Sequence, residues 1–523
     1  MDTSTLARVT VTNPINLKEL YSFEEPTTAE LDQVFARARA MEPLLRKMSV
    51  KERVGHMNNV RQYIIDNREW ILDRIIEETG KSRMDALTAE VFEVTDVFDY
   101  FEKVTEKLLK DKSVYTPLPL LGKKSKIYWE PLGTVLIIAP WNFPFYQGIV
   151  PAMLAFLAGN PVLFKPSEVT PMKGVMEKVL EGAGFPKDAI QVVYGAKNTG
   201  AQLIERRPAK IHFTGSVNTG KKIMALAAQQ LIPVDLELGG KDPSLVFEDV
   251  DLERTVNGIM WGAFTNAGQS CTSIERLYIH ESIYQPLLDM LVEKTKKLTV
   301  SHAGRDYKSP ADVDMGTVTA EFQIRIIEDH IKDAVERGGK VLCGGSRQPG
   351  THHFPPTIVA DVDHSFKIAS VETFGPVIAV MKFKTEEEAI RLANDSPYGL
   401  SASVWSKDLK RAERVAREII TGNVSINSHM LTEGNPALPF GGIKDSGFGR
   451  YKGEAGIYTF CNSKSVLIDV QGKKIEPHWY PFTPEKYALL TDLMVALFSK
   501  SKNWVKFAVS GLKIDNIGTK QKL

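Results

Sequence analysis

The sequence predicts an α/β protein with two or three domains built around mostly parallel sheets. Its 523 residues exceed the size at which a single hydrophobic core keeps growing. From about Ile127, short apolar and β-branched runs alternate with helical stretches such as 171–181. The runs are residues 135–138, 162–164, 191–194 and 211–213, and a second alternating region extends from about 244 to 449. Such alternation is typical of βαβ units, which form parallel sheets.

The first hundred residues are predicted to be mainly helical. Apolar residues recur at the i, i+3, i+4, i+7 spacing of a half-buried helix at Leu31, Val34, Phe35 and Ala38. Ser49 with Glu52 is a capping-box start, and Gly80 is a suitable helix stop. The apolar stretch 148–164 is interrupted by Asn160 and by prolines. We therefore expect it to be a buried helix followed by a buried strand and not a membrane span.

The composition excludes several classes of protein. The 65 Lys and Arg nearly balance the 64 Asp and Glu, which gives no reason to expect nucleic acid as a partner. Three cysteines, Cys271, Cys343 and Cys461, lie far apart and form no metal-ligand spacing, so no metal site is expected. So few cysteines fit a reducing cytosol. The first residues show no basic segment followed by an apolar one, so we expect no secretory signal and a cytoplasmic protein.

Four segments carry residues suited to carbonyl chemistry. They are 140–144 (PWNFP), 213–220 (FTGSVNTG), 237–241 (ELGGK) and 266–271 (NAGQSC). Each alone has an ordinary structural explanation, such as a turn or a buried apolar cysteine. Together they supply a thiol nucleophile, a carboxylate base, an amide donor and a strand-turn-helix phosphate site. Those groups are what covalent oxidation of a carbonyl requires.

These segments resemble the signatures of the aldehyde dehydrogenase superfamily. Further matches follow in the same order at 165–168 (KPSE), 372–376 (ETFGP) and 439–447 (PFGGIKDSG), so the resemblance spans roughly residues 30 to 465. It implies an aldehyde dehydrogenase-like fold with a Rossmann-type cofactor domain (1–112 and 132–238) and an α/β catalytic domain (239–450). It also implies a small β oligomerisation hairpin (113–131 and 451–470) in a homodimer or homotetramer, which leaves 471–523 as an extension.

The same resemblance implies three catalytic residues. Cys271 would attack the aldehyde carbon as a thiolate, so its surroundings must lower its pKa or a base must take its proton. The amide of Asn142 and the backbone N–H of Cys271 would hold the oxyanion. Glu237 would activate the water that hydrolyses the thioester, a task suited to a carboxylate whose pKa is raised by partial burial. The implied reaction is NAD-dependent oxidation of an aldehyde to a carboxylic acid.

The resemblance also implies the cofactor contacts. Gly215, Ser216 and Gly220 bracket the turn and helix start near the pyrophosphate, although the G-x-G-x-x-G fingerprint is absent. The other expected contacts are Lys165 and Glu168 at the adenosine ribose, Glu372 at the nicotinamide ribose, and Trp141 and Phe374 beside the cofactor. A carboxylate at Glu168 accepts a bond from a ribose 2′-OH but repels a 2′-phosphate, which favours NAD and leaves NADP open.

The substrate is less well specified than the reaction. Dehydrogenases for succinate semialdehyde carry arginines at positions that align with Val150 and Thr265, and neither is an arginine here. Aromatic residues that suggest an apolar tunnel are Trp141, Phe143, Phe145, Tyr146, Phe264 and Phe440. We expect a neutral, apolar aldehyde, aliphatic or aromatic.

Three alternatives stay open. The extended C-terminus resembles a subgroup that includes proteins named succinate-semialdehyde dehydrogenase. A coenzyme A-acylating reductase is disfavoured because such enzymes usually lack a glutamate at the position of Glu237. A non-catalytic scaffold is disfavoured because Cys271, Glu237 and Asn142 are all present.

The C-terminal extension has two interpretations. Thr483-Pro484-Glu485 is a helix start, and a stripe at helical spacing follows at Leu489, Leu490, Leu493, Met494, Leu497 and Phe498. From Lys500 onward six lysines face one acid. The segment is either a helix packed on its own domain or subunit interface, or an interfacial membrane helix. It is too short to span a bilayer.

Overall fold

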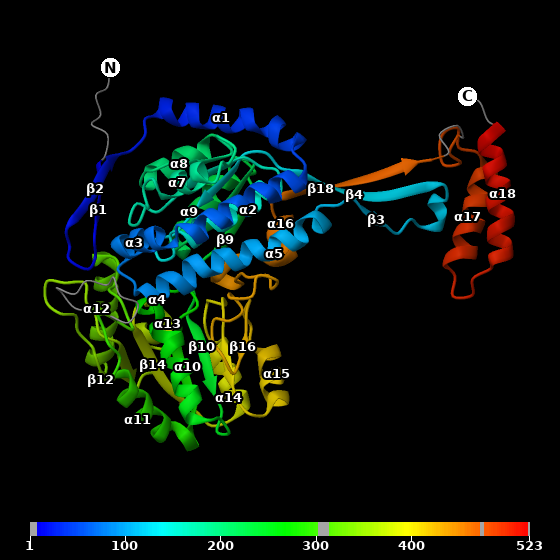
Figure 1. The fold of residues 1–523 in the computed structure, drawn as a ribbon. Coiled ribbons are helices and arrows are strands. Elements are labelled where there is room, and N and C mark those ends of the chain that lie inside the picture. Colours follow the sequence, from blue (N-terminus) through cyan, green and yellow to red (C-terminus); the bar gives the residue numbers. More distant parts are fainter. Residues whose placement is uncertain (1–7, 302–312, 471–474, 521–523) are drawn as a thin grey trace. The chain divides into compact units, whose positions relative to one another are not determined.

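The computed structural model describes residues 8–301, 313–470 and 475–520. Two compact units are formed, Met1–Lys110 with Trp129–Asn462 and Asp111–Tyr128 with Ser463–Leu523 (Figure 1). The residues that argued against a secretory signal (1–4) and the last lysine of the extension (Lys522) lie outside the described residues. The predicted α/β fold class is confirmed in the first unit by two largely parallel sheets.

The first sheet has six strands and contains the predicted βαβ runs. In spatial order its strands are β17 (Gly447–Phe448), β9 (Val234–Glu237), β8 (Lys210–Thr214), β5 (Val135–Ile138), β6 (Val162–Lys165) and β7 (Ile190–Val192). All neighbours pair in parallel except β17, which runs antiparallel to β9. Strands β5, β6 and β8 are buried along their whole length, as expected for a parallel sheet covered on both faces.

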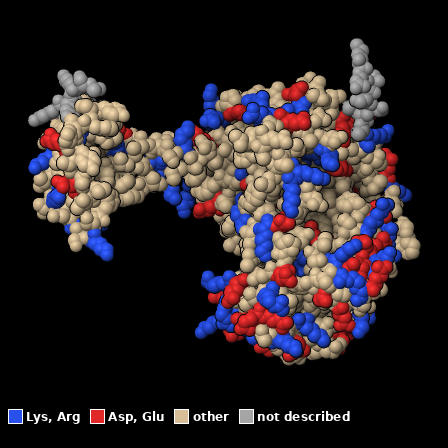
Figure 2. All heavy atoms as spheres, turned by 180° about the vertical axis from the view of Figure 1, so that it is seen from behind, with Lys and Arg blue, Asp and Glu red and all other residues tan. Residues whose placement is uncertain are grey.

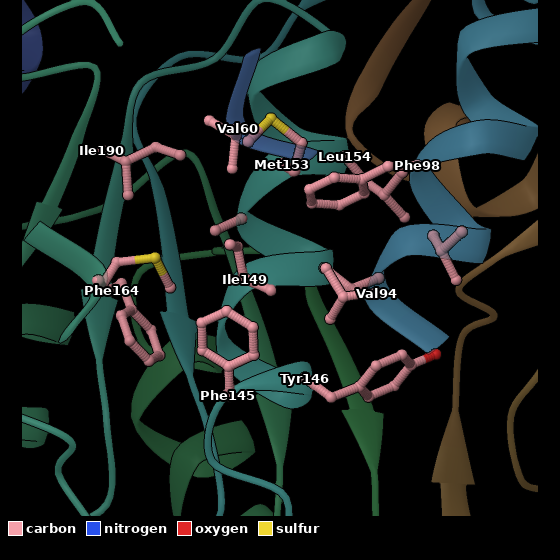
Figure 3. Packing of buried hydrophobic residues seen from close by; sticks show 14 of the residues in the cluster. Val60, Val94, Phe98, Phe145, Tyr146, Ile149, Met153, Leu154, Phe164 and Ile190 are labelled. Carbon is pink, nitrogen blue, oxygen red and sulfur yellow. The ribbon is translucent and has the colours of Figure 1, made fainter. Parts of the chain in front are cut away.

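Helices cover both faces of this sheet. One face packs against α1 (Thr28–Lys47), α8 (Lys197–Glu205) and α9 (Val217–Ala228). The other packs against α2 (Val50–Asp66), α5 (Glu93–Leu108), α6 (Tyr146–Leu157) and α7 (Val175–Gly182). Figure 3 shows side chains of α6 between the sheet and α5, where Ile149, Met153 and Leu154 lie near Val94 and Phe98. Every residue of α6 is buried, so the apolar stretch 148–164 is a core helix followed by β6.

The predicted helix signals of the N-terminal region are largely confirmed. Ser49 and Glu52 form the capping box of α2, and Gly80 ends a helix at φ 72°, a conformation that glycine adopts without strain. The two signals belong to different helices, because α2 ends at Asp66 and α3 (Arg68–Thr79) begins after Asn67. The prediction of helices is wrong at residues 8–24, where β1 (Arg8–Thr12) and β2 (Glu19–Glu24) form an antiparallel hairpin. The short helix α4 (Arg83–Ala86) follows α3.

The second sheet of the first unit has seven strands. In spatial order they are β12 (Lys340–Cys343), β13 (Thr357–Ala360), β14 (Val377–Phe383), β11 (Ile274–His280), β10 (Asp242–Val246), β15 (Ser403–Trp405) and β16 (Ser425–Ile426), with β12 antiparallel. The helices on one face are α10 (Leu252–Phe264) and α11 (Tyr284–Thr295). Those on the other are α12 (Glu321–Glu336), α13 (Lys367–Ser370), α14 (Glu386–Asn394) and α15 (Leu409–Glu418).

The remaining elements include a small sheet and a helical pair. The small sheet has the order β18 (Cys461–Asp469), β4 (Lys123–Pro131) and β3 (Lys112–Val114), and α16 (Gly453–Tyr458) precedes β18. In the second unit, α17 (Pro484–Phe498) packs against α18 (Trp504–Lys520). Thr483 caps α17 and Pro484 occupies its first turn, as predicted. No helix in the described ranges is both long and apolar enough to cross a bilayer.

Candidate active site

A cavity of about 680 Å³ lies at the carboxyl ends of the six-stranded sheet. The chain continues from β5 to β6 and β7 on one side and returns to β8 and β9 on the other, so the order reverses between β5 and β8. Ligands of open α/β sheets bind at such a switch point. Predicted residues that line the cavity are Trp141, Asn142, Lys165, Glu168, Gly215, Ser216, Glu237, Cys271, Glu372 and Phe374. Gly220 instead lies inside α9, where a Cβ would come within 2.6 Å of Leu238.

A sharp turn after α10 presents Cys271. Asn266, Ala267 and Gly268 have positive φ angles of 51°, 54° and 66°, and the first two carry a Cβ that disfavours this conformation. A Cβ on Gly268 would come within 2.1 Å of the Gly375 carbonyl oxygen, so only glycine fits there. Within the described parts of the chain, the backbone N–H of Cys271 donates to no protein acceptor. It remains available for an oxyanion.

Asn142 is held rigidly after β5. Its side-chain amide donates one hydrogen bond to the Gln269 carbonyl at 3.0 Å. Because an amide nitrogen carries two hydrogens, the second stays available for a ligand. The backbone carbonyl of Asn142 accepts hydrogen bonds from Lys81 Nζ at 2.8 Å and from Asn266 Nδ2 at 3.2 Å. The loop that carries Asn142 is thus tied to the loop that carries Cys271.

A buried ion pair holds the loop that carries Asn142. Lys81 Nζ lies 2.5 Å from Glu90 Oε1, and both side chains are fully buried. The other carboxylate oxygen of Glu90 accepts from the backbone N–H groups of Phe145 at 2.8 Å and Tyr146 at 3.2 Å. This pair was not predicted from the sequence, because the pattern around both residues indicates only an amphipathic helix.

Cys271 and Glu237 share an environment that favours their neutral forms. Burial raises the pKa of the Cys271 thiol well above its usual range, and the charges of Glu433 and Asp242 add to the effect. Burial also raises the pKa of Glu237 well above that of a free carboxyl, while the charge of Arg450 opposes it. The backbone N–H of Gly442 also opposes the rise of this pKa, and within the described chain the Glu237 carboxylate has no side-chain hydrogen-bond partner.

The opposite side of the cavity is polar and contains the predicted cofactor residues. Lys165 is buried at the end of β6, where burial lowers its pKa, and its Nζ lies 3.7 Å from Glu168 Oε2. Ser216 is the N-cap of α9, so the helix N-terminus opens at the cavity. Burial and the charge of Glu275 raise the pKa of Glu372 to about 8, although the Gly240 N–H donates to it at 3.2 Å.

A second buried ion pair positions the segment that carries Phe374. Lys241 contacts Glu275, and both side chains are buried. The Glu275 carboxylate accepts from the backbone N–H groups of Thr373 at 2.7 Å and Phe374 at 2.9 Å. Phe374 has φ 51° and packs edge-on against Trp141, with ring centroids 5.3 Å apart. Glu275 was likewise not predicted, because its partners are distant in sequence.

A charged cluster lies beside Cys271 and was not predicted. Thr272 donates a hydrogen bond to Glu433, and Lys452 Nζ donates to the Glu433 carbonyl. Burial lowers the pKa of Lys452, while the charges of Glu93 and Glu433 oppose this. Burial raises the pKa of Glu93 to about 8 despite the charge of Lys452. A lysine next to a glycine, here Gly453, gives no sequence signal for burial, which explains why the cluster was not predicted.

The predicted aromatic tunnel separates into distinct groups. Phe145, Tyr146 and Phe440 belong to the buried cluster that Cys271 contacts, and Phe143 packs against the same cluster. Phe264 lies in another core, behind the seven-stranded sheet. Trp141 lines the cavity on the side of Phe374.

Comparisons with known proteins agree with this geometry. A family model described as "Aldehyde dehydrogenase family" matches residues 1–466. A 4,4'-diapolycopene aldehyde oxidase from Methylomonas sp is 37% identical over 92% of this chain and 90% of its own length. A Mycobacterium ulcerans protein named for succinate-semialdehyde dehydrogenase activity with NADP(+) is 32% identical over 86% of each chain.

Solved structures match the same part of the chain. The crystal structure of betaine aldehyde dehydrogenase from Staphylococcus aureus in complex with NAD+ superposes with a TM-score of 0.84 and 30% identity. The match covers 92% of this chain and 95% of that one. The family model and these relatives establish that the chain belongs to the aldehyde dehydrogenase family.

Proposed function

We propose that this chain oxidises neutral, apolar aldehydes to carboxylic acids with NAD, through a thiohemiacetal and then a thioester on Cys271. The observation that carries the proposal is the convergence of Cys271, Glu237 and Asn142 on one cavity at the sheet's switch point. A nucleophile, a base and an oxyanion donor in one enclosed space are suited to covalent catalysis on a carbonyl.

In the acylation half, Cys271 Sγ bonds to the aldehyde carbon and its proton passes to a base; collapse of the resulting oxyanion would then expel the aldehyde hydrogen as hydride to the bound nicotinamide and leave the thioester. Glu237 is the candidate base, because its raised pKa makes its carboxylate a strong proton acceptor. The carbonyl oxygen becomes an oxyanion, which receives hydrogen bonds from the free Asn142 amide hydrogen and the Cys271 N–H. Removal of one such donor typically costs roughly 3–4 kcal/mol of transition-state stabilisation.

In the deacylation half, water attacks the thioester carbon. Glu237, which has first released the proton from Cys271 to solvent, takes a proton from that water, the C–S bond breaks, and Glu237 returns the proton to the Cys271 sulfur as the acid leaves. The same two donors hold the second oxyanion. Glu237 lines the cavity and has no side-chain hydrogen-bond partner in the described chain, which supports this role.

The residues around the cavity fit a dinucleotide. Ser216 and Gly215 at the start of α9 suit the pyrophosphate, Lys165 and Glu168 suit a ribose, and Glu372 suits the second ribose. When bound, the nicotinamide supplies a hydride acceptor. The negative charge of Glu168 favours NAD over a 2′-phosphorylated cofactor. A solved relative in complex with NAD+ supports the choice, and a relative named with NADP(+) keeps that cofactor as a secondary candidate.

The charges around Cys271 support a substrate without a carboxylate. The buried ammonium groups are engaged by acids, Lys81 by Glu90 and Lys241 by Glu275, and Lys452 lies in the field of Glu93 and Glu433. The Methylomonas relative is named for an aldehyde of diapolycopene, a long hydrocarbon, which supports the same class.

We also propose the three-part domain division and the homo-oligomer that the sequence implies. The cofactor part comprises 1–112 and 132–238, the catalytic part 239–450, and the small sheet formed from 113–131 and 451–470 serves self-association. Light scattering of the purified protein distinguishes a monomer from a dimer or tetramer.

Glu237→Gln tests the assignment of the base. If Glu237 acts mainly in deacylation, this variant releases one equivalent of NADH in a burst and then turns over slowly. Loss of the burst as well places Glu237 in the activation of Cys271. Cys271→Ala should abolish dehydrogenation and leave NAD binding nearly intact, whereas Cys343→Ala serves as the control and should retain full activity.

A rate screen over aldehydes tests the substrate class. Values of kcat/KM should rise with chain length for neutral aliphatic aldehydes and stay lower for succinate semialdehyde. A preference for succinate semialdehyde would refute the neutral-substrate proposal while leaving Cys271 in its role. Formation of acyl-coenzyme A upon addition of coenzyme A would instead identify the acylating class.

A further inference from the structure

The helical pair of the second unit is apolar on both its inner and its outer faces. The inner face of α17 comprises Ala496 and Leu497, which are 2% and 8% exposed, and α18 contributes Ile514 at 4%. This contact already satisfies the need of each helix to bury one stripe. Apolar residues on the remaining faces therefore need another explanation.

The outer face of α17 carries a charge-free apolar stripe. It consists of Tyr487, Leu490, Met494 and Phe498, which are 75%, 41%, 56% and 71% exposed. Spacings of three, four and four residues place them on one side of the helix. Single exposed apolar residues are ordinary on a protein surface, but a contiguous stripe marks a contact site.

The turn to α18 and the start of that helix extend the apolar surface. Trp504, Val505, Val509 and Leu512 are 54%, 75%, 46% and 69% exposed and share one side of α18. The opposite side carries Ser510 and Ile514, both 4% exposed, against α17. In the rear view, the surface of this helical pair is mostly tan with few charged side chains (Figure 2).

The charges of the segment that carries this surface are mostly positive. Residues 487–514 contain one acid, Asp492, and four lysines, namely Lys500, Lys502, Lys506 and Lys513. Lys500 and Lys502 are exposed in the turn, and the Lys502 ammonium lies 5.9 Å from the Trp504 ring centroid. Lys506 pairs with Asp492 at 2.8 Å, so Lys500 and Lys502 supply the net positive charge of the turn.

We propose that the α17–α18 turn, residues 498–506, docks on an anionic lipid surface. Exposed Phe and Trp side chains next to lysines on flexible stems suit the boundary between lipid headgroups and acyl chains. A second copy of this chain is a less suitable occupant. The turn lysines would repel one another across a self-complementary interface, whereas anionic headgroups attract them.

Cosedimentation of the full-length protein with vesicles tests the proposal. Vesicles of phosphatidylcholine with phosphatidylglycerol should bind the protein at low salt, vesicles of phosphatidylcholine alone should bind it much more weakly, and added salt should release it. Each lysine near such a surface contributes about fivefold in binding, so Lys500→Gln with Lys502→Gln should weaken binding about 25-fold. The matched control is Lys407→Gln with Lys410→Gln, two exposed lysines of the first unit.

Tryptophan variants test the apolar part of the contact. Trp504→Ser should weaken vesicle binding by at least about tenfold, because an inserted aromatic side chain is lost. Trp261→Ser is the matched control, since Trp261 is 49% exposed on α10. Brominated lipids should quench the intrinsic fluorescence of the full-length protein, and Trp504→Phe should reduce that quenching. Turnover of a short, soluble aldehyde should stay unchanged in all these variants.

Two results would overturn the proposal. The first is failure of the full-length protein to bind anionic vesicles at low salt. The second is a change of oligomeric state in Trp504→Ser, measured by light scattering, without a change in vesicle binding, which would assign the surface to a second copy. Neither result tests the proposed chemistry at Cys271, because turnover of soluble aldehydes measures that chemistry separately.

Discussion

Lys81→Met should both destabilise the first unit and slow catalysis. The substitution keeps the length of the side chain and removes the ammonium, so Glu90 stays buried and negatively charged without its partner. It also removes the hydrogen bond to the Asn142 carbonyl. The Asn142 carbonyl thus loses one of its two hydrogen-bond donors.

The expected magnitude follows from the complete burial of this pair. Breaking a buried ion pair by removing one partner costs about 3–5 kcal/mol, mainly because the remaining charge is uncompensated. A misplacement of about 1 Å at a catalytic group can reduce the rate about 100-fold. We therefore expect kcat/KM for the aldehyde to fall by up to about 100-fold, with a smaller change in NAD affinity.

Urea unfolding monitored by tryptophan fluorescence, together with steady-state kinetics, measures both effects. The double variant Lys81→Met with Glu90→Gln should recover more than half of the lost stability. Its amide oxygen still accepts from the Phe145 and Tyr146 N–H groups, and the uncompensated charge is gone. The matched control is Lys103→Met, which breaks an exposed pair with Asp99 and should cost less than about 1 kcal/mol.

An equal loss of stability in Lys81→Met and Lys103→Met would refute the claim that the buried charge of Glu90 needs Lys81. It is also refuted if stability falls but Glu90→Gln restores none of it, because the buried charge would then not be the cause. A loss of stability with unchanged kcat/KM would separate the two roles and show that Asn142 is held by its other contacts.

Three further outcomes are expected from the site. Because the pKa of Glu237 is raised, its carboxylate form gains population as pH rises, so kcat should fall on the acidic side in the wild type and lose that dependence in Glu237→Gln. Lys452→Met removes a positive charge that lowers the pKa of Glu237, so the acidic limb should move to higher pH; an unmoved limb would exclude the coupling. Glu168→Ser should raise kcat/KM with NADP relative to NAD, and an unchanged ratio would mean that Glu168 does not face the 2′ position.

The sequence predicted much of the site because its chemical groups lie in short local segments. The site residues lie near strand ends or helix starts: Asn142 follows β5, Glu237 ends β9 and Ser216 caps α9. Parallel strands bring their carboxyl ends to one edge of the sheet. Turn chemistry and strand patterns are local, so they can be recognised without knowledge of the distant chain. The same reason explains the correct capping box at Ser49 and the helix start at Thr483.

The supporting residues could not be predicted, because burial of a charge depends on contacts between distant segments. The sequence pattern places Lys81 and Glu90 on the surface of a helical region, yet both are buried against the backbone of residues 142–146, which is distant in sequence. The burial of Glu275 and of Lys452 depends on how both sheets pack around Cys271, which the sequence alone does not show. The raised pKa values of Cys271 and Glu237 have the same origin, since desolvation is their main cause.

The extension shows the same division between local pattern and tertiary packing. The sequence alone determined that a helix begins at Thr483 and that apolar residues recur along it. It did not determine which of them would be buried, because the predicted stripe is wide enough to face two directions. Packing against α18 turns Leu497 inward and leaves Met494 and Phe498 outward. A helix can bury only one side against a single neighbour, so the tertiary structure decided which apolar residues form the exposed surface.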